Sequence, residues 1–310
     1  MPTVIDEAAH NYKRATVVAI CFCVATLEGY DVQAFGVAAP LIARSLHLSM
    51  PQIGYAGAAL ALGIAIGAAI GGIAADRVGF KAVLVTSVVW FGLCSVVNGM
   101  VANDNSLTVA RFATGLGVGA AMPNLVAIAI EIALPERRAS VVTAMFVGFP
   151  TGAAVAALAT RWLLHGEAWR LVFTIGGVLQ LIISPLILFL LPPVHVRTAR
   201  ETRRGWLVAL FGRGLAIPTM LIWVAIFLSL FILYLMLNWL PSLVVAKGLP
   251  PGTGALASFW FNLVGVSGGW RWVQLSIAAD FVGRWLQHTW PLRRSWRSLL
   301  TPTDLRKSLC

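Results

Sequence analysis

Charged residues are scarce in this sequence. Asp, Glu, Lys and Arg make up 11% of the 310 residues, whereas soluble domains carry about 25%. Hydrophobic residues make up 59%, and the mean hydropathy is +0.84. This composition excludes an ordinary soluble protein and indicates an integral membrane protein.

The sequence also lacks the residue spacings of most metal-binding and catalytic sites. Cys21, Cys23 and Cys94 lie in apolar runs and Cys310 is the last residue, so the cysteines form no disulfide framework and no zinc-binding pattern. There is no nucleophile elbow and no phosphate-binding loop. A membrane enzyme is therefore disfavoured, and we expect no metal and no cofactor.

Acidic residues are fewer than basic ones, at 12 against 23, which gives a net charge of +11. Such a charge can indicate a nucleic-acid partner, but the Lys and Arg residues here lie in short loops and in the tail. Membrane proteins fix their topology by keeping such loops in the cytoplasm. We therefore expect no nucleic-acid partner, and we predict that the N-terminus is cytoplasmic.

Apolar runs long enough to cross a bilayer, which takes about 20 residues, predict a helical membrane protein. The predicted helices cover 15–41, 53–75, 82–102, 107–132, 139–164, a sixth segment that ends near Leu191, 217–245, and an eighth segment that starts near Ala255 and loses its apolar character after Gly269. The predicted organisation has four parts: a six-helix half at 1–193, a basic cytoplasmic linker at 194–214, a partial second half of about two helices at 215–275, and an irregular Trp/Arg-rich tail at 276–310.

An internal repeat supports the division into halves. Ala-Ala-Asp-Arg-Val-Gly at 74–79 is echoed by Ala-Ala-Asp-Phe-Val-Gly at 278–283, in each case two helices into its half. Such an echo is typical of a duplicated transporter. No later run is apolar and long enough to span a bilayer, so we interpret the second half as incomplete, with the reading frame departing from its ancestral course near Trp270 or Trp285.

Two acidic residues, Glu28 and Asp31, lie within the first apolar run. A carboxylate at membrane depth costs several kcal/mol unless it faces a cavity, a partner or a proton, so such residues are functional candidates. The alternative is a structural pair in which each acid is satisfied by a neighbouring helix.

Three motifs resemble those of the major facilitator superfamily. The loop 71–81 reads Gly-Gly-x-x-x-Asp-Arg-x-Gly-x-Lys, and the fourth helix contains Arg111-x-x-x-Gly-x-Gly-x-Gly-Ala. Glu-Gly-Tyr-Asp at 28–31 is similar to the first-helix motif of the superfamily's aromatic acid:proton symporters. Together with Gln33, the run 36–40, the Met-Pro-Asn-Leu at 122–125 and the Asn-Trp-Leu-Pro at 238–241, it most resembles transporters of 3-(3-hydroxyphenyl)propionate.

The resemblance implies a proton-coupled symporter that imports a small aromatic carboxylate through the bacterial inner membrane, driven by the proton gradient. Arg111 would bind the substrate carboxylate, since a guanidinium binds carboxylates in a two-pronged geometry. Asp31 would carry the proton, because substrate binding to Arg111 would release Asp31 to protonate. Glu28, one helical turn away on nearly the same face, would share the proton or orient Asp31.

The resemblance also assigns weaker roles. Tyr30, Asn124 and Trp239 would contact the aromatic ring or a phenol hydroxyl, although each is more often a packing residue. An inner gate would form by pairing across helices in the outward-open state. Its residues would be Asp76, Arg77, Lys81, Glu131 and Arg138, and the alternative is that these charges only set the topology.

Family members have twelve helices in two halves, and this chain supplies the first half and about two helices of the second. A second hypothesis is therefore open, namely a truncated or frameshifted remnant that inserts into the membrane without transporting. Alternating access rocks one half against the other, so a lone chain would need a partner to enclose its substrate. The sequence leaves the oligomeric state open.

Overall fold

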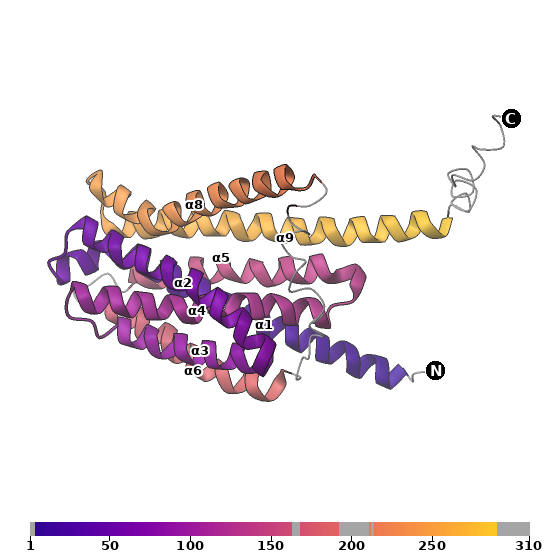
Figure 1. The fold of residues 1–310 in the computed structure, drawn as a ribbon. Coiled ribbons are helices and arrows are strands. Elements are labelled where there is room, and N and C mark those ends of the chain that lie inside the picture. Colours follow the sequence, from indigo (N-terminus) through magenta and orange to yellow (C-terminus); the bar gives the residue numbers. More distant parts are fainter. Residues whose placement is uncertain (1–3, 163–167, 192–210, 212–213, 290–310) are drawn as a thin grey trace.

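The computed structural model describes residues 4–162, 168–191, 211 and 214–289, and every regular element in these ranges is a helix (Figure 1). The helices are α1 (Val4–Ser45), α2 (Met50–Val78), α3 (Phe80–Asn98), α4 (Asp104–Ile132), the 3₁₀ turn η1 (Pro135–Arg137), α5 (Arg138–Trp162), α6 (Trp169–Leu190), α8 (Ala216–Ala246) and α9 (Pro251–Thr289).

The eight predicted helical segments are thus confirmed as helices, with bounds that differ by a few residues except at the two ends of the chain. Helix α1 starts at Val4 because the polar residues before the apolar run continue the helix. Within the described residues, seven helices are long and apolar enough to cross a membrane: α1, α2, α3, α4, α5 with η1, α6 and α8. The protein is a multi-pass membrane protein.

Helix α9 corrects one prediction. It continues as one helix through Thr289, so residues 276–289 do not begin the irregular tail that the sequence predicted at 276. That prediction used hydropathy, which detects membrane spans, whereas helix formation depends on backbone propensity, and no proline interrupts residues 276–290. The tail from 290 and nearly all of the linker 194–214 lie outside the described residues.

The bundle is arranged in layers (Figure 1). Helices α3 and α6 pack together on one side and α8 and α9 on the other, with α1, α2, α4 and α5 between them. Within this middle group, α2 packs along α4 and α1 packs along α5. Helix α9 lies along α5, and α8 contacts α1. The segment of α1 that carries Glu28 and Asp31 is therefore packed among helices from the first six and from the two that follow the linker.

Glycines set the closest helix approaches. Gly63 and Gly67 of α2 face the backbone of α4 so closely that a Cβ at either position would overlap a backbone carbonyl, that of Phe112 or Leu116. These glycines therefore let the α2 and α4 backbones approach each other closely. On the other side, a Cβ at Gly29 of α1 would overlap the backbone of Phe149 on α5. That contact fixes the rotation of α1 beside Glu28 and Asp31.

We predict opposite effects for two alanine substitutions on α2. Gly67→Ala inserts a methyl group against the Leu116 backbone and should lower the free energy of unfolding by about 1–3 kcal/mol. Gly72→Ala meets no atom within 4 Å and should raise it by about 0.5–1 kcal/mol, because alanine is the better helix former. Thermal unfolding of the detergent-purified protein measures both, and equal effects would contradict this packing.

Candidate functional site

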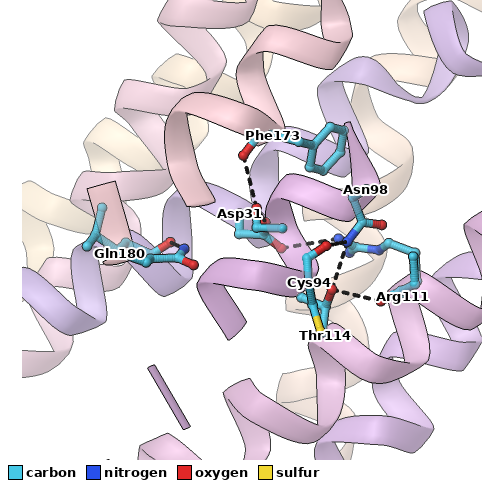
Figure 2. Close-up of polar contacts among 10 residues, drawn as sticks. Asp31, Cys94, Asn98, Arg111, Thr114, Phe173 and Gln180 are labelled. Atoms are coloured by element: carbon cyan, nitrogen blue, oxygen red, sulfur yellow. Dashed lines mark hydrogen bonds and ion pairs between the residues drawn. The ribbon is translucent and has the colours of Figure 1, made fainter. Parts of the chain in front are cut away.

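Asp31 and Arg111 form an ion pair inside the bundle (Figure 2). Helix α4 begins at Asp104 because Asn103 caps it, its Oδ1 accepting a hydrogen bond from the Ser106 N–H at 2.9 Å. This start places Arg111 about two turns into the helix. Its Nη1 lies 3.2 Å from Oδ2 of Asp31, and the two side chains are 0% and 1% exposed. The two residues that the sequence singled out are in direct contact.

The other carboxylate oxygen of Asp31 is held by α3. The Ser95 hydroxyl lies 2.5 Å from Oδ1 of Asp31 and 3.2 Å from the carbonyl oxygen of Phe173 on α6. Ser95 is itself fully buried. Asp31 therefore has one partner on α4 and another on α3.

Arg111 has unused hydrogen-bonding capacity. Its Nε and Nη2 are buried and have no hydrogen-bond partner among the described residues. The guanidinium carbon lies 4.3 Å from the centre of the Phe35 ring, a cation–π contact. A carboxylate with two oxygens matches the fork of donors that a guanidinium offers.

A small amide network supports α3 and α4 beside the pair (Figure 2). The Asn98 Nδ2 donates to the Cys94 carbonyl at 2.9 Å and to the Thr114 hydroxyl at 2.7 Å. Thr114 in turn donates to the Ala110 carbonyl at 2.8 Å. These bonds tie the segment of α3 that carries Ser95 to the segment of α4 that carries the arginine.

Glu28 is the second carboxyl of the site, and it stands alone. It is 0% exposed, and neither of its oxygens has a hydrogen-bond partner among the described residues. Tyr234 of α8 lies within electrostatic range. An unpaired carboxylate is too costly to bury, so the geometry around Glu28 fits its neutral, protonated form.

Gln33 links α1 to the helices that follow the linker. Pro241 has no N–H, so the Leu237 carbonyl, four residues earlier in α8, has no intrahelical donor. Gln33 Nε2 donates to that carbonyl at 3.1 Å, and Gln33 Oε1 accepts from Asn262 Nδ2 of α9 at 2.9 Å. Gly36, one turn along α1, leaves room for the same Leu237 carbonyl. One side chain thus connects α1, α8 and α9.

A pocket of about 260 Å³ adjoins the charged centre. It lies between α1, α2 and α8, and its lining includes Phe35, Gly54, Tyr234, Asn238 and Trp239. The Phe35 ring therefore has Arg111 on one side and lines this pocket as well. The predicted contact residue Trp239 lies in the pocket wall rather than beside the guanidinium.

Tyr30 and Asn124 have partners elsewhere. The Tyr30 hydroxyl donates to the Val172 carbonyl of α6 at 3.1 Å, so it packs between helices. Asn124 Nδ2 donates to the Ala120 carbonyl at 2.6 Å. Asn124 is 13 residues beyond Arg111, or roughly 20 Å along α4. The structure does not bring these two residues to the ion pair.

The predicted gate residues lie at the end of the bundle where α1 begins (Figure 1), at the adjoining ends of α2, α3, α4 and α5. In the part of the chain that is described, they form no ion pair with one another. Four are exposed and Lys81 is half-buried. The predicted pairing belongs to the outward-open state, so it stays a prediction.

Sequence reasoning missed Ser95, Phe35 and Asn262 as parts of the site, and it noted Gln33 only as part of a motif. Gln33 and Asn262 carry a usable signal, because an amide inside an apolar run needs a partner. Ser95 and Phe35 carry none, since serine and phenylalanine are common in membrane helices.

Comparison with known proteins identifies the fold and the relatives. Residues 21–298 match the family model of the Major Facilitator Superfamily. The chain is 40% identical over 251 residues to the 3-(3-hydroxy-phenyl)propionate transporter of Escherichia coli K12, covering 81% of this chain and 62% of that protein. It is 30% identical over 297 residues to the 4-hydroxybenzoate transporter PcaK of Acinetobacter baylyi, covering 84% of this chain and 65% of PcaK. The chain thus spans less than two thirds of each relative.

Among solved structures, the D-xylose-proton symporter superposes with a TM-score of 0.66 at 17% identity, covering 81% of this chain and 66% of that one. At this identity the likeness establishes the fold. The all-helical partial major facilitator fold predicted from the sequence is confirmed.

We predict that the Gln33 bridge depends on Pro241. Gln33→Leu leaves the buried Leu237 carbonyl without a donor and should lower the free energy of unfolding by about 1–3 kcal/mol. In a Pro241→Ala background, the restored N–H bonds that carbonyl, so the same substitution should cost clearly less. A double-mutant cycle followed by thermal unfolding measures the coupling, and additive effects would refute the bridge.

Proposed function

The chain belongs to the Major Facilitator Superfamily, and from this premise we propose that it forms the binding and proton-coupling part of a symporter for a small aromatic carboxylate. A hydroxyphenylpropionate is the representative substrate, and the proton gradient supplies the energy. The relatives named above transport aromatic acids, and they are longer than this chain. The proposal therefore concerns what these residues do within the transporting unit.

One observation carries the proposal, namely the buried Arg111 with two free donors. A cation enclosed by apolar helices is costly unless it has an anionic partner. Asp31 supplies that partner through Nη1 alone, which leaves Nε and Nη2 for a second anion. A substrate carboxylate would bind this open edge and compete with Asp31 for the positive charge.

That competition couples the substrate to a proton. While Arg111 faces Asp31, the carboxylate of Asp31 is stabilised as an anion. When the substrate takes over the guanidinium, Asp31 becomes a buried carboxylate without a counter-ion and binds a proton instead. Substrate and proton are then carried together, and release of one favours release of the other.

Glu28 stores a proton close to Asp31. Because it is fully buried without a partner, it is protonated when Asp31 is ionised. The two acids lie three residues apart, on neighbouring positions of the same helix face. A proton held on Glu28 is one turn away from Asp31 when the substrate frees it. Glu28, which is buried without a counter-ion, then takes up another proton from solution, so the net uptake is one proton.

The pocket beside Phe35 suits the aromatic part of the substrate. Its wall contains the Phe35, Tyr234 and Trp239 side chains, and Asn238 Oδ1 has no partner among the described residues. Aromatic rings pack favourably edge-to-face or offset, and the free amide oxygen accepts a phenol hydroxyl. Because Phe35 lies between the pocket and Arg111, its ring must turn aside before a carboxylate reaches the guanidinium. Tyr30 and Asn124, with partners elsewhere, play no direct part in this proposal.

The basic loops determine the proposed orientation of the protein and the position of its gate. We place the protein in the bacterial inner membrane with the N-terminus and linker in the cytoplasm, following the basic loops. Asp76, Arg77, Lys81, Glu131 and Arg138 then line the cytoplasmic end and close it by pairing in the outward-open state. The lack of ion pairs among these five described residues is compatible with an open inner end.

The test is uptake of labelled 3-hydroxyphenylpropionate by cells that express the chain under an inward proton gradient. We expect saturable uptake that falls to background in Asp31→Asn and after a gradient-collapsing ionophore is added. Gradient-dependent uptake that persists in Asp31→Asn would refute the coupling role. No uptake despite confirmed membrane insertion would support the non-transporting alternative.

Two Arg→Lys variants test whether the two-pronged shape of the Arg111 guanidinium, rather than its charge alone, binds the substrate. Arg111→Lys keeps the positive charge but loses the two-pronged fork, so labelled substrate should bind the purified protein about ten- to a hundredfold more weakly. Arg44→Lys makes the same change at an exposed position and should leave binding unchanged.

A further inference from the structure

The Ser95 hydroxyl stands between two acceptors on two other helices. Its oxygen lies 2.5 Å from Oδ1 of Asp31 on α1 and 3.2 Å from the Phe173 carbonyl on α6. A serine hydroxyl carries one proton and two lone pairs. It therefore donates well to only one of these acceptors at a time, and the protonation state of Asp31 decides which.

We propose that Ser95 is a positioning residue that converts protonation of Asp31 into a new hydrogen bond between α3 and α6. The inference rests on the proposed function of Asp31 as proton carrier. While Asp31 is ionised, Ser95 donates to its Oδ1. When Asp31 binds a proton on Oδ1, that O–H donates to the Ser95 oxygen, and the hydroxyl turns to donate to Phe173.

The step moves no proton through Ser95. The proton that arrives stays on Asp31, and the serine proton stays on the Ser95 oxygen as the hydroxyl rotates about its Cβ–Oγ bond. The Asp31–Ser95 hydrogen bond survives in both states with its direction reversed. The change is one added bond from α3 to the Phe173 carbonyl, together with loss of the charge that Arg111 faces.

The helices around this hydroxyl are closely packed, so a reoriented bond has consequences. Gly92 of α3 and Gly177 of α6 face each other's backbone, and Gly176 of α6 lies against the Tyr30 ring of α1. Small residues at such contacts let the two helix backbones approach each other closely. Protonation of Asp31 thus tightens α3 on α6 at the junction where both contact α1.

Other titratable groups lie near Asp31, and the experiment must distinguish them. The charged residues of α5 and α6, which are Arg138, Arg161 and Arg170, lie at or near the ends of their helices. Tyr30, Cys94 and Arg111 lie within electrostatic range of Asp31. Glu28 lies one helical turn from Asp31, and Tyr234 of α8 lies within electrostatic range of Glu28. Within the described residues, the Ser95 hydroxyl is hydrogen-bonded to Asp31 and to the Phe173 carbonyl and to none of these five groups.

The experiment is infrared difference spectroscopy of the purified full chain in lipid during a pH titration. The C=O band of neutral Asp31 is identified by its loss in Asp31→Asn. In Ser95→Ala we expect this band to move to the higher frequency of a carboxyl without a partner. We also expect it to appear about one pH unit higher, because the ionised form loses a charge-assisted hydrogen bond that is stronger than the neutral bond lost by the protonated form.

Two variants keep the result interpretable. Ser95→Thr retains the hydroxyl and should restore both the frequency and the pH profile, with Ser95→Cys as a weaker donor if threonine does not fold. Ser87→Ala makes the same change at another buried serine of α3 and should behave as the wild type. Thermal unfolding confirms that each variant is folded.

The outcomes separate this inference from the proposed function. An Asp31 band that is unchanged in Ser95→Ala, or that never appears over the titrated range, overturns the positioning role. A band that responds as expected in a protein that takes up no aromatic acid supports Ser95 while the proposed transport fails. Equal shifts in Ser95→Ala and Ser87→Ala would show a general packing effect and would also overturn it.

Discussion

A positive charge buried among apolar helices is the constraint on which the rest of this structure depends. Removing an ion pair from water costs several kcal/mol per ion, which the mutual attraction often fails to offset, whereas leaving one ion unpaired costs about 3–5 kcal/mol more. The pair of Asp31 and Arg111 is therefore a poor device for stability. The pair is well suited to exchanging one anion for another at Arg111, because Asp31 must become neutral once another anion replaces it.

Close helix contacts hold the segments that carry Asp31 and Arg111 in place. Glycine contacts bring α1 against α5 and α2 against α4, so the charged segments are held by backbone contact. The carbonyl that Pro241 leaves free gives α8 a specific bond to Gln33, only two residues from Asp31 on α1. The same short stretch of α1 therefore bears the charge and contacts the helices that follow the linker.

The sequence was sufficient for the helices and for the central pair, since apolar length specifies spans and ionised residues inside them are rare. Its limits were physical. Hydropathy did not predict the full length of α9, because it measures membrane affinity rather than helix propensity. The motif predicts a substrate contact for the phenol of Tyr30, whereas its hydrogen bond to the Val172 carbonyl depends on tertiary structure. Ser95 and Phe35 acquire their roles only from neighbours that are 64 and 76 residues away in sequence, Asp31 and Arg111.

The most direct test is to count the protons that accompany ligand binding. Titration calorimetry of the purified chain with 3-hydroxyphenylpropionate, repeated in buffers of different ionisation enthalpy, gives that number. Exchange at Arg111 predicts that about one proton is taken up per ligand bound, because the released Asp31 carboxylate must be neutralised, and that none is taken up in Asp31→Asn. Binding without proton uptake, or the same uptake in both proteins, would contradict the account.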